Sequence, residues 1–217
     1  MLSFSIKEFL NVLENYNLAI WPFQVFVYIL IVMTLFFLFR KTKYSSKLVF
    51  AILSFFWLFN GIVFSLIYWS PSHLFGYIFA ILCTIQGLLF LYSIIRSDIT
   101  IGHLNKIFTL IGLLFILYAI IGYQTFGYFL GHIYPRYFPA CLVPCPTTIF
   151  TIGIFLIINN KIPVKYFIIP LIIAVSGVLV VYNGIYEDIG LIITGLLGTI
   201  LIIRRAAQFK ITRILTV

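Results

Sequence analysis

Seven long, mostly apolar runs, each bounded by charged residues, prolines or turn residues, make up most of this chain. They cover residues 19–39, 47–69, 74–95, 105–123, 140–158, 162–182 and 185–203. A helix needs about 20 apolar residues to cross the hydrocarbon core, whereas a strand of a membrane barrel is about 10 residues long and alternates in polarity. The runs do not alternate. They predict an all-α fold, a polytopic transmembrane helical bundle with seven spans.

Composition agrees with a lipid environment. Hydrophobic residues make up 63% of the chain and charged residues 9%, whereas about a quarter of a soluble domain is charged. The net charge of +9 sits at the ends of the apolar runs. We therefore expect the lipid bilayer, and not nucleic acid, to be the main partner. Oligomeric state is not predicted.

The basic residues orient the bundle. If the N-terminus is outside, 12 of the 14 Lys and Arg residues fall on the inner side, and only Lys7 and Arg136 lie outside. An excess of Lys and Arg marks cytoplasmic connections. The sequence thus predicts an outer N-terminus and a cytoplasmic C-terminus in the cell membrane, with no second domain within residues 1–217.

Both ends of this single transmembrane domain carry further predictions. Residues 1–18 contain a capping box, Ser5 with Glu8, followed by an apolar face with Phe9 and Leu13, so we expect an amphipathic helix on the outer surface rather than a frayed leader. Residues 19–203 form the bundle, and residues 204–217 form a basic cytoplasmic tail. Residues 124–139, rich in aromatics and glycine, suggest either a re-entrant segment or an ordinary outer loop.

Polar residues within the runs are candidate site residues because they cost free energy at membrane depth. Asn60 and Gln86 either bridge helices or line a polar cavity. The acidic pair Glu187 and Asp188 suggests a solvated turn, or a partner for Arg136 at the outer mouth.

The stretch from Cys141 to Thr148 reads Cys-Leu-Val-Pro-Cys-Pro-Thr-Thr. Pro146 suits the first turn of a helix. Cys141 and Cys145 could join His132 in binding a soft metal, take part in redox chemistry, or only pack. No cofactor is expected. Few residues could serve as a general acid or base, because the three histidines lie in different loops and no charged residue lies at the centre of a run.

Several segments resemble an uncharacterised family of bacterial integral-membrane proteins, DUF6064. The resemblance rests on Tyr16-Asn17-Leu18-Ala19-Ile20-Trp21-Pro22, Trp57 with Asn60-Gly61, Gly131-His132-Ile133-Tyr134-Pro135, and the run from Pro144-Cys145-Pro146-Thr147-Thr148 to Gly153. The family pattern has a Tyr-His pair where this chain has Phe64-Ser65. The resemblance implies a bacterial membrane protein and adds no chemistry.

Three functions remain open. The first is binding or translocation of a small solute or ion through an outward-facing pocket. Its candidate residues are Asn60, Gln86, His132, Cys145, Thr147 and Thr148, with Trp21 and Tyr134 as walls. The second is a small membrane enzyme in which Cys145 acts as nucleophile and His132 as base, although the scarcity of acid–base residues argues against an enzyme. The third is a structural or accessory subunit.

Overall fold

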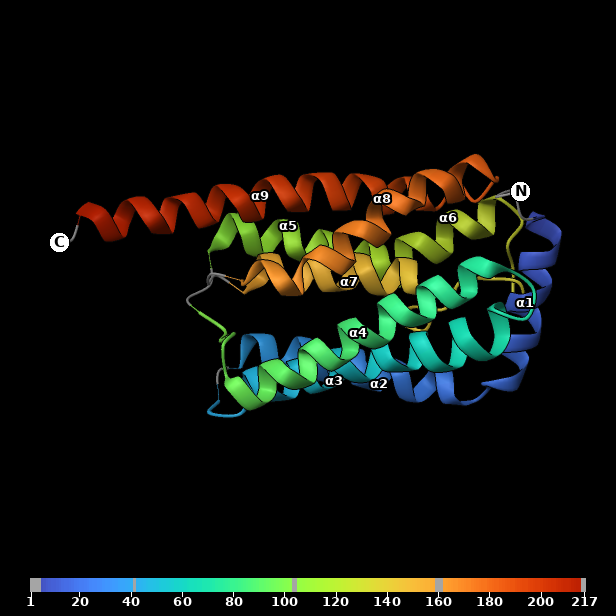
Figure 1. The fold of residues 1–217 in the computed structure, drawn as a ribbon, viewed down its shortest axis with the longest axis horizontal. Coiled ribbons are helices and arrows are strands. Elements are labelled where there is room, and N and C mark those ends of the chain that lie inside the picture. The colour runs from blue at the N-terminus through green and yellow to red at the C-terminus, as the bar shows by residue number, and fades with distance from the viewer. Residues whose placement is uncertain (1–4, 41, 103–104, 159–161, 216–217) are drawn as a thin grey trace.

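The computed structural model describes residues 5–40, 42–102, 105–158 and 162–215, and every regular element in these residues is helical. The elements are α1 (Ile6–Ala19), α2 (Phe23–Phe39), α3 (Ser45–Phe59), η1 (Asn60–Trp69), α4 (Leu74–Arg96), α5 (Lys106–Leu117), η2 (Tyr118–Gly122), α6 (Tyr123–Phe129), α7 (Pro144–Ile157), η3 (Val164–Tyr166), α8 (Ile168–Tyr182) and α9 (Asp188–Leu215). Each predicted run contains at least one helix. Apart from α1, the long helices lie side by side along one axis, and the connections collect at its two ends (Figure 1).

Within the described ranges, four helices are long and apolar enough to cross a membrane: Ser45–Trp69, Leu74–Arg96, Lys106–Phe129 and Asp188–Ala206. Their outward surfaces carry large apolar side chains, such as Ile95 at 80% exposure and Ile107 at 69%. Apolar patches of this kind are rare on soluble monomers. The described residues thus form an all-helical fold whose long apolar helices are compatible with a membrane protein. Two shorter apolar helices, α7 and α8, and the bent pair α1–α2 occupy the remaining runs.

Helix α1 crosses the end of the bundle. It makes an angle of 86° with α2, and its apolar face, including Phe9, Leu13 and Tyr16, is buried. The predicted amphipathic helix is present. Ser5 occupies the N-cap position, but its side chain makes no capping hydrogen bond, so the predicted capping box does not form.

Two of the long helices contain π-helical turns. Helix α3 continues as η1, and α5 continues through η2 into α6. The helix that begins at Lys106 therefore ends at Phe129, six residues beyond the predicted end of the run at residue 123. The wider turn at η2 lets the chain remain helical through Gly122 and Tyr123.

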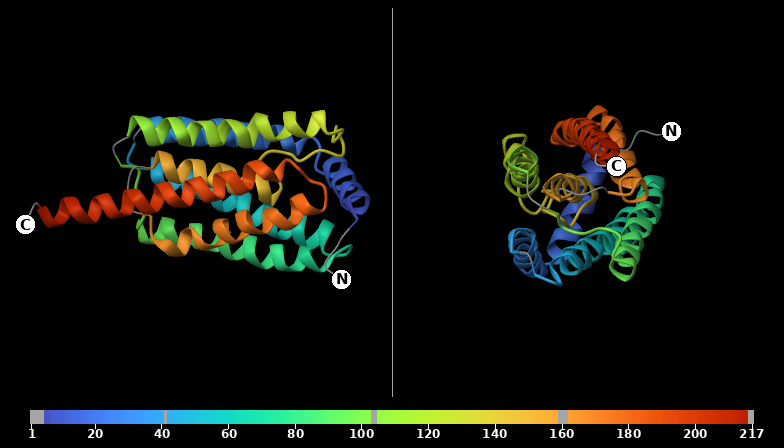
Figure 2. Two further views of the ribbon diagram at one scale, coloured as in Figure 1. Left: turned by 90° about the horizontal axis from the view of Figure 1, so that it is seen from above. Right: turned by 90° about the vertical axis from the view of Figure 1, so that its left-hand side faces the viewer.

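Helix α7 lies at the centre of the bundle, surrounded by other helices in the end view (Figure 2). Every residue of α7 except Cys145 is buried. At its crossing with α5, a Cβ on Gly153 would lie 2.7 Å from the carbonyl oxygen of Gly112, and a Cβ on Gly112 would lie 2.6 Å from that of Gly153. Two glycines thus allow the two backbones to approach closely.

The carbonyl end of α7 is capped by a side chain from α9. Arg205, only 3% exposed, donates from Nη1 to the Leu156 carbonyl at 3.1 Å and from Nη2 to the Phe155 carbonyl at 2.9 Å. The last carbonyls of a helix have no partner within the helix, and a cation there also complements the helix dipole. Arg205 therefore satisfies backbone groups that lipid could not.

Candidate functional site

A buried connection without helical structure leads into α7. Residues 138–143 are all buried, and side chains of other elements donate to two of their backbone carbonyls. The Tyr16 hydroxyl donates to the Leu142 carbonyl at 2.6 Å, and Asn60 Nδ2 donates to the Cys141 carbonyl at 3.2 Å. Irregular backbone inside a bundle requires partners of this kind. Protein thus satisfies two carbonyls of this connection, whereas residues 124–129 of the preceding stretch belong to helix α6.

Asn60 also ties η1 to the first turn of α7. Its Nδ2 donates to Thr147 Oγ1 at 2.9 Å, and Thr147 in turn donates to the Val143 carbonyl at 2.7 Å. Thr148 donates to the Pro144 carbonyl at 2.9 Å. Asn60, Thr147 and Thr148 are each fully buried. These predicted site residues lie together, and the hydrogen bonds of Asn60 join η1 to α7 and to the connection before it.

The other predicted residues lie elsewhere. Gln86 donates to the Tyr166 carbonyl at 3.0 Å, in the connection that follows α7, whereas Asn60 lies beside the start of α7. The predicted walls, Trp21 and Tyr134, are 58% and 50% exposed. An interfacial position agrees with this exposure, and neither ring is enclosed as a pocket wall would be.

Two adjacent acidic residues form the most unusual group in the bundle. Glu187 and Asp188 are fully buried where α9 begins, so the predicted solvated turn is wrong. His132 Nδ1 contacts Glu187 Oε1, and the Tyr123 hydroxyl donates to Asp188 Oδ1. Cys145 Sγ donates to Asp188 Oδ2 at 3.3 Å. We call these five residues the outer carboxyl cluster.

The cluster is built from four distant parts of the chain, and glycine makes room for it. A Cβ on Gly127 would lie 2.8 Å from Glu187 Oε1, and Gly184, in the turn before Glu187, has a φ of +99°. Asp188 is the first residue of α9, where the positive end of the helix dipole favours a carboxylate. Gly127 belongs to the glycine-rich outer stretch, and it was the one sequence signal that pointed toward this burial.

Arg136 is not a partner of the acidic pair. Its Nε donates to Glu14 Oε2 at 2.7 Å, on the exposed side of α1. The predicted closure of the outer mouth by Arg136 with Glu187 or Asp188 is therefore wrong. His132, which is 8% exposed, is the partner of Glu187 instead.

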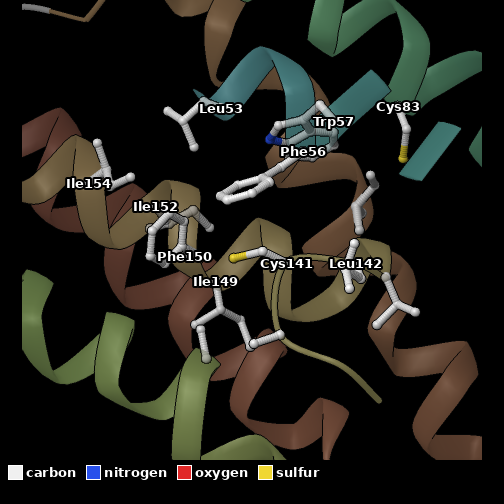
Figure 3. Close-up of a cluster of buried hydrophobic side chains, with 14 of the residues drawn as sticks. Leu53, Phe56, Trp57, Cys83, Cys141, Leu142, Ile149, Phe150, Ile152 and Ile154 are labelled. Carbon is white, nitrogen blue, oxygen red and sulfur yellow. The ribbon is translucent and has the colours of Figure 1, made fainter. Parts of the chain in front are cut away.

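The structure does not gather Cys141, Cys145 and His132 into a metal site. Cys141 lies in an apolar cluster with Phe56 and Phe150 (Figure 3), while Cys145 and His132 bond to different carboxyl groups. Within the part of the chain that the structure describes, no three His, Cys, Asp or Glu residues are placed to hold a metal ion.

A small apolar cavity adjoins Cys145. It has a volume of about 20 Å³ and is lined by Phe9, Phe64, Trp69, Phe79, Phe138, Val143, Pro144, Cys145 and Val180. Roughly 10–15 Å³ suffices for one water molecule. The cavity therefore admits no more than one or two water-sized molecules next to the cluster.

Comparison with known proteins places the chain in a family. The model of a family of unknown function, DUF6064, matches residues 6–213. The chain belongs to this family. The match confirms the resemblance seen in the sequence and includes every residue of the outer carboxyl cluster. No curated protein and no solved structure matches the chain.

Proposed function

We propose that the chain is a seven-span protein of a bacterial plasma membrane that binds a small cation, the proton, at the outer carboxyl cluster. The N-terminus lies outside and the C-terminus in the cytoplasm. The proposal narrows the broader idea of a small-solute or ion-binding membrane protein to one chemistry and one place in the fold.

The distribution of charge supports this topology. The end of the bundle that carries the C-terminal part of α9 also carries Arg40, Lys43, Lys47, Arg96, Lys106, Lys165 and Arg204. The opposite end carries Lys7 and Arg136. Helices α2, α7 and α8 run along the same axis as the four long helices (Figure 1). Because α7 is enclosed by protein, its short length leaves no helix end exposed to hydrocarbon.

The observation that carries the proposal is an unsatisfied carboxyl oxygen. Glu187 Oε2 is fully buried and has no hydrogen-bonding partner among the described residues, whereas both oxygens of Asp188 accept hydrogen bonds. Ionisable groups buried in membrane bundles are costly and most often serve an ion or proton site. Glu187 Oε2 is thus the free position at which a proton would attach.

Charge balance favours one bound cation. The cluster contains two acidic side chains, Glu187 and Asp188, and one basic side chain, His132. An ion pair between His132 and one carboxyl group would leave the second carboxyl group uncompensated, and one bound proton there would remove the cost of a buried unpaired charge. A metal ion would need several converging ligands, and no such group is present within the described ranges. Binding, rather than passage, is proposed because the cluster lies at one end of the bundle.

Infrared difference spectroscopy tests this proposal. Between about pH 5 and about pH 9, ordinary surface carboxyl groups are already ionised, so a titrating carboxylic C=O band reports the buried cluster. We expect such a band in the full-length protein and a changed band in Glu187→Gln, because that substitution removes one of the two carboxyl groups of the cluster. Glu14→Gln, which removes the exposed carboxylate paired with Arg136, should keep it. A wild-type protein without a band, or a band unchanged in Glu187→Gln, would contradict the proposal.

A further inference from the structure

One polar member of the outer carboxyl cluster reaches the surface of the bundle. His132 is 8% exposed, whereas Glu187, Asp188 and Tyr123 are fully buried. Cys145 is partly exposed, but it lines the small cavity described above, whose other lining side chains are hydrophobic. His132 is therefore the side chain through which solvent can reach the buried carboxyl groups.

The two ring nitrogens of His132 have different surroundings. Nδ1 contacts Glu187 Oε1. No described residue shares a hydrogen bond with Nε2, and this nitrogen is not buried, in contrast to Glu187 Oε2. Nε2 therefore keeps access to solvent while Nδ1 faces inward. One imidazole ring thus connects the surface to a buried carboxyl group.

The turn after α6 holds the ring in this position. Gly131 has a φ of +88°, and the His132 amide donates to the Gly127 carbonyl at 2.8 Å, which is a common way to end a helix. A Cβ on Gly131 would meet no atom within 4 Å, so the backbone conformation, and not lack of space, favours glycine here. The Phe138 ring packs against the imidazole, with 6.1 Å between ring centroids.

The neighbouring charged groups have partners of their own. Both oxygens of Asp188 accept hydrogen bonds from other members of the cluster. Arg136, four residues after His132, donates to Glu14 on α1. Among the described residues, Glu187 is thus the acidic partner of the imidazole, and its second oxygen has no hydrogen-bonding partner.

We propose that His132 carries the proton between solvent and Glu187, a role that rests on the proposed function of the cluster. Starting from a neutral imidazole with its hydrogen on Nδ1, a proton from solvent binds Nε2, and the Nδ1 hydrogen then moves to Glu187 Oε1. The N–H bond at Nδ1 breaks, an O–H bond forms, and a neutral imidazole and a neutral carboxyl group remain. Release follows the same steps in reverse. Histidine suits this role because its ring gains and loses a proton near neutral pH.

Time-resolved infrared spectroscopy of the full-length protein tests the relay. Light releases protons from a photolabile acid, and the rise of the carboxylic C=O band reports their arrival at the cluster. A general acid–base group typically speeds proton transfer by about 100-fold or more, so His132→Asn should slow the rise, at a given proton concentration, by about 100-fold. Asparagine keeps an N–H donor for Glu187 but has no second nitrogen that could bind a proton.

His73→Asn is the matched control. His73 lies outside the cluster and caps α4, and asparagine is also a good helix cap, so this variant should keep the wild-type rate. Circular dichroism of each variant verifies folding.

Small bases in solution separate a relay from a packing role. In His132→Ala, added imidazole should restore the rate in proportion to its concentration, whereas pyrazole, a ring of the same size that is far less basic, should not. The proposal is overturned if the band rises as fast in His132→Asn as in wild type, or if pyrazole restores the rate as well as imidazole does. A wild-type protein without a titrating band would instead contradict the proposed function itself, so the two failures are distinguishable.

Discussion

Asp98 lies in the connection between α4 and α5, outside the membrane-spanning helices. Partial burial raises the pKa of its carboxyl group, but the hydrogen bonds from Tyr166 and Lys165 outweigh burial and leave that pKa below its ordinary value. Because the folded-state pKa is lowered, the ionised carboxylate stabilises the fold. The stabilisation is complete above the unfolded-state pKa of about 3.9 and is lost as the pH falls through the folded-state pKa.

The lowered pKa of Asp98 predicts how the acid unfolding of wild type and of Asp98→Asn will differ. Lowering the pH below about 4 should narrow the difference in stability between the two proteins, since the wild type loses the contribution of the charged carboxylate. The unfolding midpoint in detergent, measured at neutral and at acidic pH, checks this. Asp98→Asn would have to show the same pH dependence as wild type to contradict it.

Single residues also show what the sequence could and could not predict. Asn60 was correctly singled out as a costly polar residue, because its position in an apolar run is visible in the chain. The burial of Glu187 and Asp188 could not be predicted from the sequence, since both follow a short turn and resemble solvated residues. Their partners, His132 and Tyr123, are 55 and 65 residues away, and only the folded bundle brings them together.

Among the elements, α7 depends most on its neighbours. It is buried along its length, and α9 supplies the side chain that caps its carbonyl end. The sequence predicted residues 204–217 as a basic tail, in which Arg204 and Arg205 were equivalent. In the structure Arg204 is exposed and Arg205 is buried. The rotation of α9 against α7 decides which of the two adjacent arginines faces inward. That rotation cannot be predicted from composition.

Arg205→Met should therefore destabilise the protein by about 1–3 kcal/mol, because two buried carbonyls lose charged donors. Arg204→Met is the matched control and should change stability by no more than about 0.5 kcal/mol. Chemical unfolding in detergent measures both. Equal effects of the two substitutions would show that the cap contributes nothing specific to Arg205.

Element boundaries were predicted unevenly. The run at residues 74–95 became α4 with an end shifted by one residue, since apolar length and flanking turns both mark it. The run at residues 105–123 ended too early, because Gln124 and Thr125 interrupt the apolar pattern although the helix continues beyond η2 to Phe129. The Thr125 hydroxyl donates a hydrogen bond to the Ile121 carbonyl at 2.8 Å, so this polar residue is tolerated within the helix.

Over the whole molecule, the proposed seven-span topology gives a labelling prediction. Cys83 and Cys141 are fully buried and Cys145 is partly buried, so the wild-type protein should react slowly. Ser72→Cys, in the exposed connection after η1, should react with a membrane-impermeant maleimide in intact cells. Thr42→Cys, in the connection after α2, should react only after the cells are permeabilised.

The control for this experiment is wild type, which reports any reaction of the native thiols. A Thr42→Cys protein that is labelled in intact cells, with Ser72→Cys protected, would reverse the orientation. Labelling of both from outside would instead rule out an odd number of crossings between the two positions, and with it the assignment of α3 and η1 as one span.

Enclosure of α7 within the bundle also has a consequence for biogenesis. The helices that cover it include α8 and α9, which leave the ribosome after it does. When α7 first enters the bilayer, the hydrogen-bond partners of its threonines and of the connection before it, Tyr16, Trp57 and Asn60, have already been made, whereas α8 and α9 have not. The final arrangement must therefore form by rearrangement after insertion, and a chain truncated before residue 205 would leave the carbonyl end of α7 without its cap.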